Sequence, residues 1–236
     1  MLLSTHRSYA AQDGAEMDAL ETYRDRLARV VNDGYCILSR KIHSGRISID
    51  NEASLQLHYS SVLKTLGELY EFAKSDLFSI ELEKSVFLTN GAFVKSKSEN
   101  ARIDIFLKLE DRNTRENTSC AIELKFFKRK NFREPNNRYD VFKDLSNLEN
   151  YGDECDLRYF VIGTDHTHYV DQPSYSNGTR DFDFRNKKKY MAGTQLVYNT
   201  PKPYGPPLML SNSYDFKWDM LDDKYYFMKL EIPKKA

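Results

Sequence analysis

Asp104, Glu123 and Lys125 fall in two consecutive segments that alternate apolar and polar side chains. Asp104 lies in the segment 101–109, and Glu123 and Lys125 lie in the segment 119–127. Alternation of this kind is typical of β-strands, and two strands joined by a short polar loop are most simply an antiparallel hairpin. Because residues paired across a hairpin share a face, we expect these three charges to lie together.

The register of this predicted hairpin follows from its apolar residues alone. Side chains two positions apart on a strand point to the same face, and both segments carry large apolar residues at alternate positions. Matching these apolar sets on a shared core face places the charges on the opposite face. The sets are Ile103, Ile105 and Leu107 in the first segment, and Ile122, Leu124 and Phe126 in the second.

Two carboxylates and an ammonium group on inner strands are costly to remove from water unless something compensates them. A hard divalent cation between Asp104 and Glu123 would do so, since Mg²⁺ accepts carboxylate oxygens and keeps waters for a phosphate substrate. The main-chain carbonyl of Leu124 is a natural further ligand. Lys125 could orient an attacking water and offset charge that develops on the phosphorus. We therefore expect a Mg²⁺ site, with Mn²⁺ as a substitute.

Asp104 followed by Glu123-Leu124-Lys125 in the next strand resembles the bipartite motif of the PD-(D/E)xK, or restriction-endonuclease-like, nuclease superfamily. Ile103 stands at the position of the motif's proline. Residues 50–164 are expected to form a helix, three strands, a helix and a strand, which is similar to the αβββαβ core of that superfamily. The resemblance implies an α/β fold with a central mixed β-sheet flanked by helices, an added N-terminal helix and a C-terminal β extension.

The same resemblance implies a Mg²⁺-dependent DNA endonuclease of the stand-alone restriction type, which hydrolyses phosphodiester bonds. Asp104, Glu123 and Lys125 would be catalytic, and Asp104, Glu123 and the Leu124 carbonyl would hold the metal. Members often add an acidic residue from the first core helix, and Glu52 is the candidate here. The alternatives are a non-catalytic protein of this fold that binds nucleic acid or a protein partner, and an unrelated α/β interaction protein.

A basic tract follows the second strand of the hairpin. Residues 125–143 contain seven basic and two acidic residues, a net charge of +5 in a chain whose net charge is zero. Such a patch beside the site would contact DNA phosphates. The expected contacts are Lys128, Arg129, Lys130, Arg133, Arg138 and Lys143, and a second run, Arg185 with Lys187, Lys188 and Lys189, could act likewise. Asp144 is interpreted as a surface residue of a helix over 138–150.

The remaining pattern defines the other elements. Apolar spacing predicts a helix over 13–33 that ends at Asn32-Asp33-Gly34, and another from Asp50 or Asn51 to about Ser75-Asp76. Strands are expected over 79–89 and 157–163, and short strands near the C-terminus. We divide the chain into a tail and helix (1–49), a core (50–164) and a C-terminal extension of the same domain (165–236).

Composition limits the class of protein. The 236 residues include 35 Lys plus Arg and 35 Asp plus Glu, which argues against a polybasic nucleic-acid binder. Cys36, Cys120 and Cys155 form no disulfide framework, and we identify no signal peptide and no apolar run long enough to span a membrane. The sequence therefore predicts a cytoplasmic protein without a membrane partner, and it leaves a homodimer open. His166 and His168 give only a weak zinc pattern.

Overall fold

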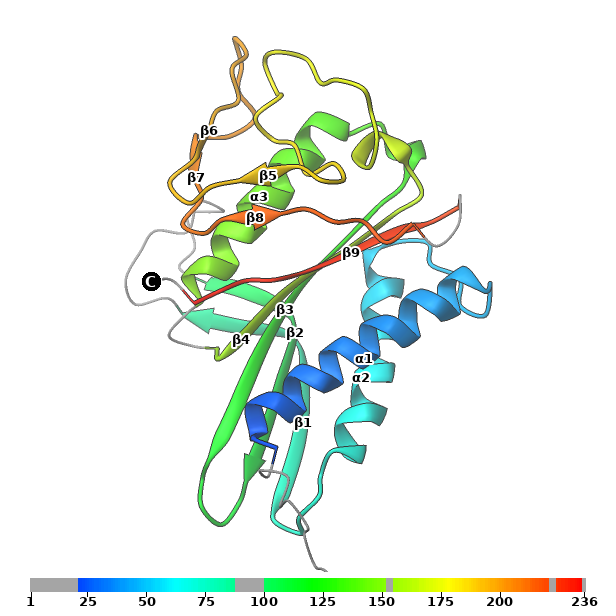
Figure 1. Cartoon of the computed structure of the whole chain (residues 1–236), viewed down its shortest axis with the longest axis vertical. Coiled ribbons are helices and arrows are strands. Elements are labelled where there is room, and N and C mark those ends of the chain that lie inside the picture. The colour runs from blue at the N-terminus through cyan, green and yellow to red at the C-terminus, as the bar shows by residue number, and fades with distance from the viewer. Residues whose placement is uncertain (1–20, 88–99, 152–154, 221–223, 235–236) are drawn as a thin grey trace, which may run out of the picture.

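A five-stranded mixed sheet runs through the centre of the protein (Figure 1). The computed structural model describes residues 21–87, 100–151, 155–220 and 224–234. The sheet order is β1-β2-β3-β4-β9, in which β1 to β3 form an antiparallel meander, β4 is parallel to β3, and β9 is antiparallel to β4. The strands are β1 (Asp76–Phe87), β2 (Asn100–Asp111), β3 (Asn117–Phe127), β4 (Leu157–Thr164) and β9 (Tyr226–Glu231).

Helices cover both faces of this sheet (Figure 1). Helices α1 (Tyr23–His43) and α2 (Glu52–Leu69) pack on one face against an apolar cluster. Helix α3 (Glu134–Asn150) packs on the other face, together with the C-terminal segments. The expectation of a mixed sheet flanked by helices is confirmed, as is the order helix, three strands, helix, strand from α2 to β4.

The start of α2 was correctly predicted, but the end of α1 was not, and residues 13–20 of the first expected helix lie outside the described residues. The Asn51 side chain accepts a hydrogen bond from the Ser54 N–H at 2.9 Å and caps α2. Helix α2 ends at Leu69, before the expected Ser75-Asp76. Helix α1 continues past Gly34 to His43. A Cβ atom on Gly34 would lie 2.8 Å from Leu63 Cδ2, so this glycine permits close packing of two helices instead of ending one.

The hairpin of β2 and β3 has the expected antiparallel pairing, with Ile105 opposite Ile122. The apolar set of β3 lies wholly in the cluster beneath α1 and α2, as expected. Ile103 differs, because it belongs to the cluster on the α3 face while Ile105 belongs to the other. The pairing of β2 with β3 begins at Ile105. Ile103 lies outside this pairing, so the hairpin register does not fix its face.

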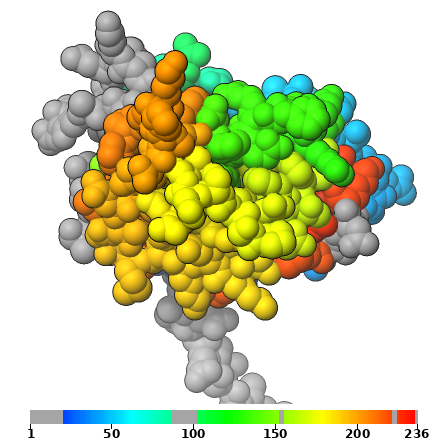
Figure 2. Space-filling model, turned by 90° about the horizontal axis from the view of Figure 1, so that it is seen from above, coloured from blue at the N-terminus to red at the C-terminus, as the bar shows by residue number. Residues whose placement is uncertain are grey.

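The C-terminal segments form a layer over α3, which Figure 2 shows in yellow and orange. Aromatic side chains fill this layer: Phe142 of α3 contacts Phe182, Phe184 and Phe216 at ring-centroid distances of 5.7–6.3 Å. No helix within the described ranges is both long and apolar enough to cross a membrane. The short elements are η1 (Arg129–Asn131), η2 (Thr167–Tyr169), β5 (Lys189–Tyr190), β6 (Gln195–Leu196), β7 (Leu208–Met209) and β8 (Tyr214–Asp215).

Candidate active site

Asp104 lies at the point where the ladder between β2 and β3 begins. Its Oδ2 accepts a hydrogen bond from the Leu124 N–H at 2.6 Å. The Gln56 side chain of α2 donates to the Asp104 carbonyl at 2.7 Å and to Glu83 Oε1 at 2.9 Å. Glu83 has a left-handed φ of 53°, an uncommon conformation for a residue other than glycine. The Asp104 carboxylate thus accepts the Leu124 N–H in place of a main-chain carbonyl. This contact lies near Glu83, where β1 is irregular.

Lys125 is the centre of the site. Its Nζ lies 3.0 Å from Asp144 Oδ2 and 3.5 Å from Glu52 Oε1, and it donates to the Leu124 carbonyl at 2.9 Å. These partners come from α3, α2 and β3, and Lys125 itself is only 13 % exposed. Carboxylates from two helices, α2 and α3, therefore converge on one ammonium group of β3.

The interpretation of Asp144 as a surface residue was wrong. Its side chain is 1 % exposed and faces Lys125. The signal was present in the sequence, since Val141, Leu145 and Leu148 form the buried stripe of α3 and Asp144 falls within that stripe. A carboxylate in an apolar helical stripe requires a buried partner, and Lys125 supplies the opposite charge.

Glu123 occupies the next position on the same face of β3 as Lys125. It is 4 % exposed, and its Oε1 accepts a hydrogen bond from the Tyr151 hydroxyl at 3.4 Å. Burial, with the Glu123 charge adding to it, raises the pKa of Tyr151 well above its ordinary value, so this hydroxyl remains a donor. Parallel pairing with Phe160 and Ile162 of β4 holds Glu123 and Lys125 in the middle of the sheet.

Carboxylates outnumber cations at this site. Burial alone would lower the pKa of Lys125, but Asp144, Glu52, Asp104 and Glu123 together raise it well above the ordinary value. Burial raises the pKa values of Glu52 and Asp104, and Lys125 opposes that rise. With all groups ionised, four carboxylates and one ammonium leave a net charge of −3.

The donor set suits a hard cation, because the groups that converge on Lys125 are carboxylate and carbonyl oxygens. The positions of these side chains fit a metal ion less well than their chemistry does. Within the described residues, no group of three or more His, Cys, Asp or Glu side chains is disposed to hold a metal ion. Asp104 is turned to the Leu124 N–H, and the ammonium group of Lys125 lies among the remaining oxygens. The excess of negative charge is the property that fits a divalent ion.

The basic loop that follows β3 has an exposed face. Arg129, Lys130 and Arg133 are exposed, and the Arg129 N–H donates to Asp165 Oδ1 at 2.7 Å. Phe132 is 81 % exposed and has a left-handed φ of 48°. Sequence reasoning missed Phe132, although an aromatic residue inside a basic, Asn-rich loop was visible. Lys128 pairs with Asp50 at 3.0 Å, beside the N-terminus of α2.

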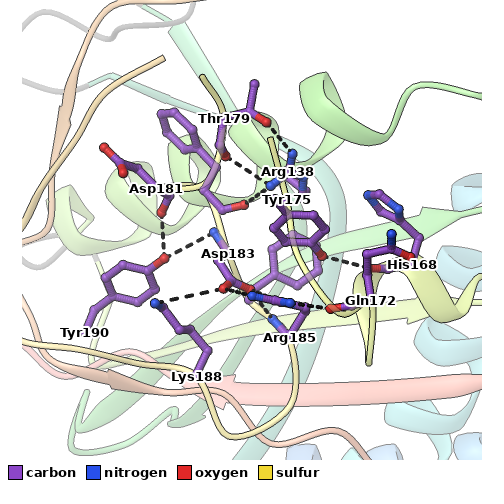
Figure 3. Close-up of polar contacts among 12 residues, drawn as sticks. Arg138, His168, Gln172, Tyr175, Thr179, Asp181, Asp183, Arg185, Lys188 and Tyr190 are labelled. Atoms are coloured by element: carbon purple, nitrogen blue, oxygen red, sulfur yellow. Dashed lines mark hydrogen bonds and ion pairs between the residues drawn. The ribbon is translucent and has the colours of Figure 1, made fainter. Parts of the chain in front are cut away.

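Arg138 was wrongly assigned to DNA contacts. It is 2 % exposed, and its guanidinium donates to the Thr179 and Phe182 carbonyls and to Thr179 Oγ1 at 2.7–3.0 Å (Figure 3). The side chain points from α3 into the C-terminal layer, because its position on the helix faces that layer. Lys143, the other expected contact on α3, is partly buried.

No family model, no curated protein and no solved structure matches this chain.

Proposed function

We propose that the protein is a Mg²⁺-dependent DNA endonuclease that hydrolyses phosphodiester bonds, related to the PD-(D/E)xK superfamily. The supporting observation is the Lys125 ammonium group held among Asp144, Glu52 and the Leu124 carbonyl, with Asp104 and Glu123 beside it. An arrangement that serves stability alone would match charges more evenly, since buried carboxylates without compensation are costly.

Lys125 would act as a cation and not as a base. The surrounding carboxylates raise its pKa, so the ammonium form persists at neutral pH. A positioned ammonium group stabilises negative charge that develops on a phosphoryl oxygen in the transition state. Asp144, at 3.0 Å, fixes the position of that ammonium group and is a positioning residue.

Asp104, Glu123 and the Leu124 carbonyl would hold Mg²⁺, and Glu52 could reach it through water. The ion would supply Lewis-acid activation of the phosphodiester. Binding it requires the carboxylates to be ionised, and Lys125 favours this form because it opposes the rise that burial causes in the pKa values of Asp104 and Glu52.

The loop 128–133 would hold the DNA. Arg129, Lys130 and Arg133 offer exposed cations to phosphates, and Phe132 offers an exposed ring to a base. A strained backbone conformation at an exposed aromatic residue is a feature that function can explain better than packing can.

Cleavage of supercoiled plasmid in Mg²⁺ or Mn²⁺ tests the proposal. We expect the wild-type protein and Glu116→Gln, an exposed acid at the turn of the hairpin, to nick the plasmid. Glu123→Gln should lose cleavage, and Lys125→Ala should lower the rate by about 10²–10³. Glu52→Ala should have a milder effect. Circular dichroism must show that each variant is folded at the assay temperature.

A metal-binding readout separates chemistry from binding. Mg²⁺ should raise the unfolding temperature of the wild-type protein and of Glu116→Gln, but not that of Glu123→Gln, because an ion that binds only the folded state stabilises it. Wild-type protein that binds DNA yet never cleaves it, across varied sequences and with both metals, would support the non-catalytic alternative.

The DNA contacts can be tested without cleavage. In metal-free protein, replacing Arg129, Lys130 and Arg133 by Gln should weaken DNA binding and reduce the dependence of affinity on salt. Phe132→Ala should weaken binding to single-stranded DNA by roughly 1–3 kcal/mol without changing the salt dependence. Unchanged affinity in both variants would show that the loop is only a solvated surface.

A further inference from the structure

An open pocket of about 470 Å³ lies in the C-terminal layer, away from the Lys125 site. Helix α3 separates the two, because Asp144 points from α3 toward Lys125 of the sheet while Arg138 points toward Thr179 and Phe182. A volume of this size is within the ordinary range for small-molecule sites.

Cations outnumber carboxylates by one in the wall of this pocket. Arg180, Arg185 and Lys188 line it, together with Asp181 and Asp183. Asp183 is already engaged, because the Arg185 guanidinium donates to both of its oxygens at 2.7–2.8 Å and Lys188 Nζ lies 3.9 Å away (Figure 3). Asp181 Oδ2 accepts the Val197 N–H at 3.1 Å. The two carboxylates are thus held by the wall itself, and one positive charge remains in excess.

A buried cation behind the wall adds to this excess. The Arg138 guanidinium lies over the Tyr175 ring at 3.6 Å from its centroid, and that of Arg185 lies 4.5 Å from the same centroid. Among the described residues Arg138 has three neutral hydrogen-bond acceptors and no carboxylate within ion-pair distance. Its charge therefore contributes a positive potential that no ion pair cancels.

The charge of Arg138 also affects the pKa of the neighbouring His168. Its ring lies 5.0 Å from that of Tyr175. Burial, followed by the charges of Arg138 and His166, lowers the pKa of His168 to about 4. Burial is the larger cause of this shift, and the contribution of Arg138 has the sign expected in a region that favours anions.

We propose that this pocket binds a phosphate group through Arg180 and Lys188, with Arg185 held in place by Asp183. A phosphate carries several acceptor oxygens and one or two negative charges, which matches a pocket lined by more than one cation better than a single carboxylate does. Amide and hydroxyl groups of Asn177 and Thr194 also line the pocket. This site is independent of the proposed nuclease chemistry.

The aromatic rings of the pocket limit what else is recognised. Tyr175 is engaged by two guanidinium groups, and Tyr190 packs against Phe142 at 5.4 Å. Because both rings have partners within the protein, we expect little base stacking. The site should therefore discriminate weakly between nucleosides and strongly against ligands that lack a phosphate.

Titration of the metal-free, full-length protein at constant ionic strength tests this inference. The probes are inorganic phosphate, a nucleoside 5′-monophosphate, the matching nucleoside, and a short oligodeoxynucleotide with and without a 5′-phosphate. We expect saturable binding of the phosphate-bearing probes, followed by calorimetry or phosphorus NMR, and no binding of the nucleoside.

Variants assign the binding to this pocket. Arg180→Gln and Lys188→Gln should each weaken phosphate binding about tenfold, which is the usual loss for one charge-assisted contact. The matched control is Lys202→Gln, an exposed residue outside the pocket, which should bind phosphate as the wild type does.

The outcomes separate the two sources of phosphate. Binding of inorganic phosphate and the monophosphate, lost in both variants, supports a free phosphate compound as ligand. Binding of the oligonucleotides alone, again lost in both variants, supports the nucleic-acid backbone. The inference is overturned if no phosphate probe binds saturably, or if both variants bind as the control does.

Discussion

The two sides of helix α3 carry opposite imbalances of charge. On the sheet side, Asp144 faces a site where four carboxylates surround one ammonium group. On the other side, Arg138 and three pocket cations face the two carboxylates of Asp181 and Asp183. Burial is the largest cause of the pKa shifts on both sides, since it raises the pKa values of Glu52 and Asp104 and lowers that of His168, to which the charge of Arg138 adds.

In the two proposals made above, one helix separates two sites for ions of opposite sign. Neither side is neutral by itself, and the proposed ligand of each would restore neutrality: a cation near Lys125, and an anion near Arg180 and Lys188. The apolar residues of α3 between them, such as Val141 and Leu145, are fully buried and exclude water that would screen the two charges from their surroundings.

The largest effect is expected from Lys125→Met. This change removes the ammonium group that lies 3.0 Å from the buried Asp144 carboxylate. Breaking a buried ion pair costs about 3–5 kcal/mol, so we expect a loss of that size in the free energy of unfolding of the metal-free protein at pH 7. Urea unfolding should show a smaller loss at pH 5, where the crowded carboxylates take up protons.

Lys128→Met is the matched control. Lys128 pairs with Asp50, which is 79 % exposed, and surface pairs contribute only about 0–1 kcal/mol. Mg²⁺ should restore part of the stability of Lys125→Met, because it replaces the lost positive charge. Equal losses in the two variants, or a loss at Lys125 that does not depend on pH, would contradict the imbalance on the sheet side.

A smaller effect is expected from Arg138→Met. The side chain donates to neutral oxygens, so its removal should cost about 1–3 kcal/mol through acceptors left unsatisfied. The pKa of His168, measured by proton NMR, should rise from about 4 by only part of the difference from its ordinary value of 6.5, because burial, the larger cause, remains. Arg133→Met, an exposed change next to the same helix, is the control.

The shift in the pKa of His168 also makes the free energy of unfolding depend on pH. In the wild-type protein the lowered pKa of His168 contributes stability that is present above pH 6.5 and is lost as the pH falls through about 4. In Arg138→Met this loss should become smaller. If the pKa of His168 stays near 4 in the variant, the positive potential on this side of α3 does not come from Arg138.

The smallest effect is a gain in stability. The raised pKa of Asp104 means that its neutral form stabilises the fold below the ordinary pKa, and that this contribution is lost as the pH rises through the raised pKa. Asp104→Asn keeps an oxygen for the Leu124 N–H but removes the charge. We expect an increase of about 0.5–2 kcal/mol in the free energy of unfolding at pH 7 without metal.

Asp111→Asn, at the far end of β2, should have the opposite sign. Its carboxylate accepts the Asn113 N–H at 2.7 Å, and this contact is the largest factor that lowers its pKa. Its neutralisation should therefore lower stability at pH 7. If both substitutions destabilise the protein, the carboxylates near Lys125 are not in excess.

Local pattern predicted a large part of the fold. Alternating residues gave the hairpin of β2 and β3, and Asn51 gave the start of α2, since both features depend on backbone geometry within one element or one pair. The prediction that α1 ends at Gly34 was wrong, because that position depends on a contact outside the element. Gly34 reads locally as a helix end, but its contact with Leu63 belongs to another helix.

The site was predicted only in its hairpin part. Alternation placed Glu123 and Lys125 on one face, and the acid at the start of α2, Glu52, lies within reach of Lys125 as expected of a residue near the site. Asp144 and Arg138 were both misassigned, because the sequence gives the helical face of a charge but not the partner that the face meets.

Local pattern in the sequence was therefore sufficient to predict the hairpin of β2 and β3, the start of α2, and the shared face of Glu123 and Lys125. The burial of Asp144 against Lys125 and of Arg138 against Thr179 follows only from the packing of the elements. Periodicity is a property of one element, whereas the burial of a charge depends on acceptors and counter-charges that arrive from distant segments when the elements pack.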